Sequence, residues 1–176
     1  MAMTRRTQAE RSAAATEKLI DATIALIGER GVDGFSISDV ADRAGVSRGL
    51  PGHYFKSRDG LVLAVAERIM KARSRHSKQG FKPLIASLSR SIARAKHPTD
   101  SLRALTRLAT AEVLPPQVDA LVQRYWDSVS DMFQGHLEAA LKEKSVRRPL
   151  DCAAAARALT AAMIGQATLA TRRNGR

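Results

Sequence analysis

Apolar residues recur every three or four positions in one segment of this chain after another, and no stretch longer than a few residues alternates as a β-strand would. Residues 7–30 illustrate the spacing, with Leu19, Ile20, Thr23, Ile24 and Ile27 at helical intervals. Aromatic residues make up only 4% of the chain, so its core depends on leucine, isoleucine, valine and alanine, which favours packed helices. The pattern predicts an all-α protein, and 176 residues suffice for one domain or two small ones.

Serine, glycine and proline residues divide the chain into the expected helices. Gly31 follows the first helix as a C-terminal cap, Gly45 breaks the second, and serines stand where helix starts need a capping hydroxyl. The fourth helix is expected to end at Gly80 and Pro83. The expected helices are 7–30, one capped by Ser36 or Ser38 and ending at 44, one starting at Ser47, 57–78, 84–96, 99–114, 117–144 and 150–171.

Residues 44–55, "AGVSRGLPGHYF", place glycine and proline beside polar groups between two regular helices. The spacing of Ala41, Gly45 and Val46 suits a helix-turn-helix. Its first helix needs a small residue at the contact, its turn needs a residue that tolerates positive φ, and an apolar residue then enters the core. Pro51 and Tyr54 fall where the second helix faces inward.

Residues 36–65, "SISDVADRAGVSRGLPGHYFKSRDGLVLAV", resemble the N-terminal DNA-binding domain of the TetR family of bacterial transcriptional regulators. The resemblance covers roughly residues 12–70 and includes the cap, "DVA", "AGVS" and "HYF" in order. It implies a three-helix DNA-binding domain at residues 1–60, with the helix-turn-helix at about 36–55. A long fourth helix would join it to a helical effector-binding and dimerisation domain at residues 61–176.

The resemblance also implies which residues meet DNA. Arg48 would pair with a guanine, Leu50 and Pro51 would contact a thymine methyl, and Gly49 would let the backbone come close. Residues at positions where the family usually contacts phosphates are Ser36, Ser38, Ser47, His53, Tyr54, Lys56 and Arg58. His53 has the alternative of a plain surface residue, and Tyr54 that of a core residue. Because Leu50, Pro51 and Gly52 depart from the usual family pattern, we expect the recognition helix to start late or be distorted.

The second half is expected to hold an apolar effector pocket and a dimer interface. Apolar helix faces suggest these pocket residues: Leu88, Ile92, Leu105, Leu108, Trp126 and Met163. Tyr125 and Trp126 are adjacent, so we expect them to face different sides of their helix. Small and apolar stripes on the last two helices suggest a four-helix dimer interface with Val122, Val129, Ala155, Ala158, Ala162 and Gly165, or alternatively a core face within one subunit.

The net charge of +12 suggests a polyanionic partner, but its distribution does not locate the DNA-reading element. Residues 61–100 carry nine lysines and arginines against two acidic residues, whereas residues 1–60 carry nine against eight. Three interpretations of this basic segment remain open: a solvated helix face, a field that speeds DNA association, or attraction of an anionic effector. The residues concerned are Arg68, Lys71, Arg73, Arg75, Lys78 and Lys82.

The sequence argues against an enzyme and for a regulator. It shows no nucleophile elbow, no phosphate-binding glycine loop and no metal-ligand cluster, so we expect no catalytic residue, metal or cofactor. Cys152 suggests a small buried apolar residue, and the absence of a signal-peptide core or membrane span suggests a cytoplasmic protein. The expected function is a homodimeric repressor that binds a palindromic operator and is released by a small-molecule effector. The alternative is an architectural or non-specific DNA-binding protein without an effector.

Overall fold

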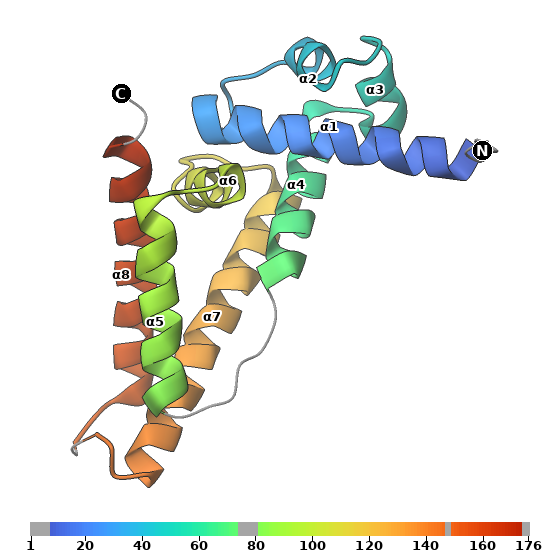
Figure 1. Ribbon diagram of the computed structural model, residues 1–176. Helices are drawn as coiled ribbons and strands as arrows, with labels where there is room; N and C mark the ends of the chain where they lie inside the picture. Colours follow the sequence, from blue (N-terminus) through green and yellow to red (C-terminus); the bar gives the residue numbers. More distant parts are fainter. Residues whose placement is uncertain (1–7, 74–80, 147–148, 174–176) are drawn as a thin grey trace, which may run out of the picture.

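The computed structural model describes residues 8–73, 81–146 and 149–173, and these residues form an all-α fold (Figure 1). In Figure 1, α1 lies across one end of the molecule with α2 and α3 on its outer side, while α5, α7 and α8 extend away on the other side. The helices are α1 (Gln8–Arg30), α2 (Ile37–Ala44), α3 (Leu50–Phe55), α4 (Arg58–Arg73), α5 (Phe81–Lys96), α6 (Asp100–Ala109), α7 (Pro116–Lys142) and α8 (Cys152–Arg173). The prediction of an all-α protein is confirmed.

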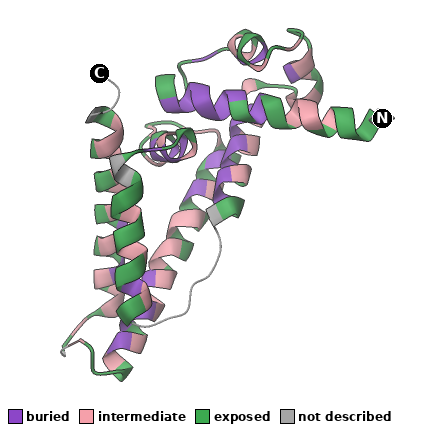
Figure 2. Cartoon of the chain, in the orientation of Figure 1, coloured by how far each residue is buried: buried purple, intermediate pink, exposed green. Residues whose placement is uncertain are grey.

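The larger hydrophobic core joins the N-terminal helices to the start of the second half of the chain. Leu19 and Ile27 of α1 are fully buried together with Val40 of α2, Leu61 of α4 and Val118 of α7. Figure 2 shows this burial concentrated along α1, α4 and the adjoining part of α7. The expected domain boundary at residue 60 therefore falls inside one continuous core, in which α4 packs against both halves.

A smaller core holds the far ends of α5, α7 and α8 together. Leu84, Phe133, Leu137 and Ala156 are buried there, with Cys152 half-buried beside them. The two cores are separate clusters of buried residues. A cavity lies between α1 and the helices α4–α8.

Local capping explains why α2 begins and ends where it does. The backbone N–H of Asp39 donates to the Ser36 hydroxyl at 3.2 Å, and Ser36 N–H donates to Asp39 Oδ2 at 2.7 Å, a reciprocal capping box. These hydrogen bonds from Ser36, with a smaller effect of Arg30, hold the pKa of Asp39 below its usual value. At the other end, Gly45 adopts a left-handed conformation at φ 66° and its N–H reaches the Ala41 carbonyl.

Replacing Gly45 by alanine is expected to destabilise the protein by about 1–2 kcal/mol, the cost of a left-handed L-residue. An added Cβ at this position would meet no atom within 4 Å, so backbone strain is the whole effect. Denaturant unfolding measures the change. An unchanged midpoint would show that the turn relaxes into another conformation.

Several helix boundaries differ from those expected. The third helix starts at Leu50 with Gly49 at its N-cap, not at Ser47, whose backbone carbonyl accepts the Leu50 N–H at 3.0 Å. The late start agrees with the expectation from Pro51, which sits in the first turn where its missing N–H costs least. Helix α6 ends at Ala109 instead of continuing to residue 114.

The remaining helix ends follow the sequence more closely. Gly60 N–H donates to the Ser57 hydroxyl at 3.1 Å, as expected for the cap of α4. Pro83 lies in the first turn of α5 and does not end α4, since a proline is tolerated at a helix start. Gly80 lies outside the described residues.

Candidate nucleic-acid interface and cavity

The turn between α2 and α3 presents Arg48 to solvent. The Arg48 side chain is 76% exposed, and its Nε lies 3.6 Å from a carboxylate oxygen of Asp42, whose side chain is 61% exposed. Such an exposed pair adds little stability, so the guanidinium is available to a stronger partner. Because α3 starts at Leu50, Arg48 is held by the turn and not by the helix itself.

The start of α3 is directed toward the core. Pro51 is buried, and the half-buried Leu50 and Tyr54 pack against the larger core. This corrects the expectation that Pro51 offers a surface to a thymine methyl, because the residue is buried. The inward orientation of Pro51 and Tyr54 agrees with their spacing in the sequence. Tyr54 also contacts the His53 ring, edge to face, with 5.2 Å between centroids.

Four of the expected phosphate contacts are exposed on this face: Ser38, Ser47, His53 and Lys56. Lys56 has the left-handed φ of 63°, and its N–H closes α3 on the Gly52 carbonyl at 3.0 Å. Two others are engaged within the protein. Ser36 is occupied by the capping box, and Arg58 is half-buried over the Phe35 ring and paired with Asp33 at 2.5 Å.

Ion pairs fasten α2 to the end of α1. Arg43 forms a bidentate pair with Glu29, with both N–O distances 2.7 Å, and Arg30 lies 3.3 Å from Asp39. The Arg43 hydrogen bonds hold the pKa of Glu29 below its usual value. These ion pairs hold α2, which precedes the face that bears Arg48 and Lys56, against the end of α1.

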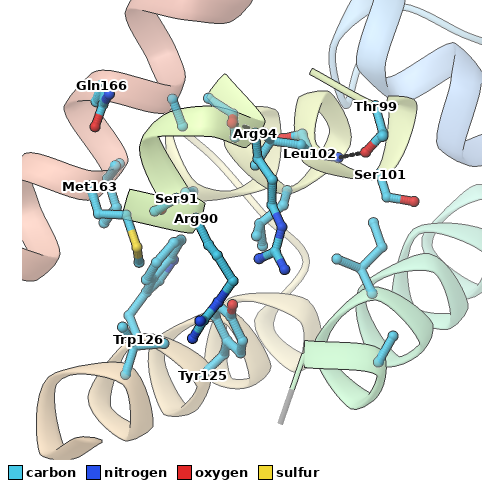
Figure 3. A pocket seen from close by; sticks show the side chains of 18 of the residues that line it. Arg90, Ser91, Arg94, Thr99, Ser101, Leu102, Tyr125, Trp126, Met163 and Gln166 are labelled. Carbon is cyan, nitrogen blue, oxygen red and sulfur yellow. Dashed lines mark hydrogen bonds between the residues drawn. The ribbon is translucent and has the colours of Figure 1, made fainter. Parts of the chain in front are cut away.

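A cavity of about 950 Å³ lies between α1 and the helices α4–α8, within the size range of small-molecule sites (Figure 3). Of the six residues expected to line a pocket, Leu105, Trp126 and Met163 do so. The other three do not: Leu108 is buried in the larger core, Leu88 packs on the smaller core, and Ile92 is exposed on α5.

Tyr125 and Trp126 both line this cavity, which corrects the expectation that they face different sides of α7. Their rings make an edge-to-face contact with centroids 4.9 Å apart. Neighbouring helical side chains differ by about 100° in direction, but the cavity spans enough of α7 to accept both. Figure 3 shows them side by side on one wall.

Sequence reasoning missed the polar wall of the cavity. Helix α5 contributes Ser87, Arg90, Ser91 and Arg94, at intervals of three and four residues. That spacing is a detectable signal, but a polar stripe on a helix normally indicates a solvent-facing surface.

The residues expected at a dimer interface divide into two groups. Val122 is buried in the larger core, Val129 lines the cavity, and Ala155 packs against the smaller core. For the apolar stripe of α7, the alternative of a core face within one subunit therefore applies. On α8, by contrast, the expected residues Ala158, Ala162 and Gly165 are exposed.

The exposed face of α8 extends beyond those three residues. Ala154, Ala161 and the 66% exposed Leu169 lie on the same side, at helical intervals. We call the set Ala154, Ala158, Ala161, Ala162, Gly165 and Leu169 the small-residue face of α8. Such a face permits another helix to approach closely.

The described residues offer no sign of metal or membrane chemistry. Nowhere in residues 8–73, 81–146 and 149–173 do three or more histidine, cysteine, aspartate or glutamate side chains gather as a metal site would require. None of the helices in these ranges combines the length and apolarity needed to cross a bilayer.

Comparison with known proteins assigns the helix-turn-helix to a family. The family model described as "Bacterial regulatory proteins, tetR family" matches residues 19–65. The HTH-type transcriptional regulator BetI of Burkholderia ambifaria (strain MC40-6) is 33% identical over 109 residues, which cover 62% of this chain and 50% of that protein. Residues 19–65 therefore belong to a TetR-family DNA-binding domain. Another TetR-type relative, the HTH-type transcriptional regulator CymR of Pseudomonas putida, is 46% identical over 67 residues, or 38% of this chain and 33% of that protein.

The chain spans about half the length of the curated relatives it matches first, but TetR-family structures resemble nearly all of it. A TetR-family transcriptional regulator from Agrobacterium tumefaciens has a TM-score of 0.80 at 19% identity, covering 90% of this chain and 88% of that one. The regulator FadR from Bacillus subtilis, solved in complex with stearoyl-CoA, has a TM-score of 0.70 at 15% identity, covering 91% and 89%. At these identities, the likeness establishes a shared fold.

Proposed function

We propose that this TetR-family protein is a transcriptional repressor that binds a palindromic operator as a homodimer and releases it when a small molecule enters the cavity. The observation that carries the proposal is the exposed face formed by the α2–α3 turn and α3. Arg48 and Lys56 are open to solvent on this face, and an ion pair holds the preceding helix α2 to α1. In a helix-turn-helix protein this face enters the major groove. The function proposed includes no catalytic step.

The small-residue face of α8 supports the homodimer. An isologous contact requires a self-complementary patch, and small apolar side chains let two symmetry-related helices lie against each other. The dimer would hold two α3 helices at a separation set by the bundle, so the half-site spacing of the operator would follow from the geometry of the protein.

Helix α4 supports the response to an effector because it connects both sites. Its residues Arg68, Ile69 and Ala72 line the cavity, and its N-terminus follows α3 after the short link at Lys56 and Ser57. A ligand that binds one position of α4 more tightly than another would change the separation of the two α3 helices in the dimer. A ligand that binds both positions equally would change nothing.

Selection from a pool of random duplexes at moderate ionic strength, followed by gel-shift titration, tests the DNA-binding function. We expect enrichment of a two-fold symmetric site with a specificity ratio of at least about a thousandfold over random DNA. A protein that is monomeric and shows no preference among duplexes would overturn the proposal.

The charge of +12 keeps a second candidate in view, an architectural DNA-binding protein without an effector. The salt dependence separates the two candidates. A non-specific binder should show the same affinity and the same slope of log K against log salt on selected and random duplexes, whereas a regulator should keep its preference at every salt concentration.

Replacing Gly49 by alanine is expected to leave stability nearly unchanged and to weaken operator binding about tenfold. Gly49 has a helical φ of −77°, and an added Cβ would meet no protein atom within 4 Å, so the fold accepts it. A close approach of DNA to this backbone would leave no room for the methyl group. Thermal unfolding and gel-shift titration measure the two effects, and unchanged binding would show that Gly49 is not at the contact.

A further inference from the structure

The cavity carries two arginines whose charge is not neutralised within the described part of the chain. Arg90 and Arg94 project from α5 toward the space beside Tyr125 and Trp126 (Figure 3). Neither arginine forms an ion pair with any described residue. A guanidinium offers a planar fork of donors that suits an oxyanion.

The acidic residues on the cavity wall are already paired with arginines other than Arg90 and Arg94. Asp21 pairs with Arg68 at 3.0 Å, and the same arginine contacts Glu17 at 2.6 Å. Asp100 lies 3.7 Å from Arg103. These pairs leave Arg90 and Arg94 as the uncompensated charges, so the α5 wall is cationic.

The opposite wall of the cavity is apolar. Trp126, Phe133, Leu105 and Met163 supply aromatic and aliphatic surface on α6, α7 and α8. The indole N–H of Trp126 is buried and donates no hydrogen bond to a described residue. A buried donor without a partner is costly, so an oxygen atom of a bound molecule would stabilise it.

We infer that the cavity binds a small amphipathic organic anion, with a carboxylate or phosphate on Arg90 and Arg94 and an apolar body along Trp126 and Met163. This ligand class rests on the proposed function, in which the cavity is the effector site. One interpretation of the basic segment was that it attracts an anionic effector. The inference assigns that role to Arg90 and Arg94, because Arg68 is already paired with Glu17 and Asp21 of α1.

Trp126 is the only tryptophan in the chain, so its fluorescence reports on the cavity directly. The test titrates the full-length protein with octanoate, octyl phosphate and neutral 1-octanol. We expect one or both anions to bind at least about tenfold more tightly than the alcohol, the effect of a charge-assisted hydrogen bond. The two anions distinguish a carboxylate site from a phosphate site.

The double variant Arg90→Gln, Arg94→Gln should abolish the preference for the anion and leave the affinity for octanol unchanged. Retained octanol binding and an unchanged circular dichroism spectrum show that the variant is folded. The matched control Arg107→Gln, Arg172→Gln removes the same charge from exposed positions that do not line the cavity, and should keep the preference.

Equal binding of anion and alcohol, absence of anion binding at millimolar concentration, or a preference that survives the double variant would overturn the inference. Gel-shift titration with the selected duplex is run in parallel. Specific DNA binding that persists while the anion preference fails removes only the ligand class, whereas loss of specific DNA binding in the unmodified protein removes the proposed function.

Discussion

Replacing Ala162 by glutamate is expected to convert the dimer into monomers and to lower operator affinity by about a hundredfold or more. In a two-fold interface each subunit contributes the same patch, so the substitution buries two like charges together. A monomer also loses the gain that comes from binding two half-sites at once, which is on the order of 10²–10⁴. Light scattering measures the mass, and gel-shift titration measures the affinity.

Ala120→Glu is the matched control for this result. Ala120 is exposed on α7 and lies outside the small-residue face of α8, so the same change there should leave a dimer with full affinity. If Ala162→Glu remains dimeric at micromolar concentration, the α8 face is not the interface, and the subunits associate through another surface.

Arg48→Ala is expected to relax operator preference by about ten- to a hundredfold while leaving affinity for random DNA nearly unchanged. A bidentate arginine–guanine contact contributes about 1–3 kcal/mol of discrimination. The 76% exposed side chain gives up only a weak surface pair with Asp42 when it moves to a base, so little of that energy is lost. Gel-shift titration on the selected duplex and a scrambled duplex measures the ratio.

Lys56→Ala provides the contrasting variant. Lys56 is an exposed point charge, so its loss should weaken binding to both duplexes alike and reduce the slope of log K against log salt by about one. Neither substitution adds backbone strain, since Arg48 precedes α3 and alanine can replace lysine at the same φ. If both variants behave alike on the two duplexes, the division of roles between base and phosphate contacts is wrong.

The helix-turn-helix was predictable because its determinants are local. The capping box at Ser36 and Asp39 and the left-handed Gly45 each involve residues within a few positions of one another. Even the late start of α3 follows from Pro51, whose ring restricts the backbone wherever it occurs. The inward side of Pro51 and Tyr54 follows from helical spacing within the same short segment.

The walls of the cavity were predicted only in part. Helical periodicity shows which residues share one face of a helix, but not which other helix or cavity that face contacts. Leu105 and Leu108 lie on the same helix and both belong to the larger core, yet only Leu105 also lines the cavity. Helix α5 turns its polar stripe with Arg90 and Arg94 toward the cavity, while Ile85 and Ile92 are 46% and 47% exposed.

The sequence by itself determined where most helices begin and end, and which short segment is shaped like a DNA-reading unit, since these depend on dihedral preferences and hydrogen bonds between near neighbours. Only the tertiary structure decided that the apolar stripe of α7 packs within one subunit and that Tyr125 and Trp126 line the same cavity. It also decided that the small-residue face of α8 is exposed. These outcomes depend on how helices far apart in the chain cross each other, and side-chain spacing within one helix does not contain that information.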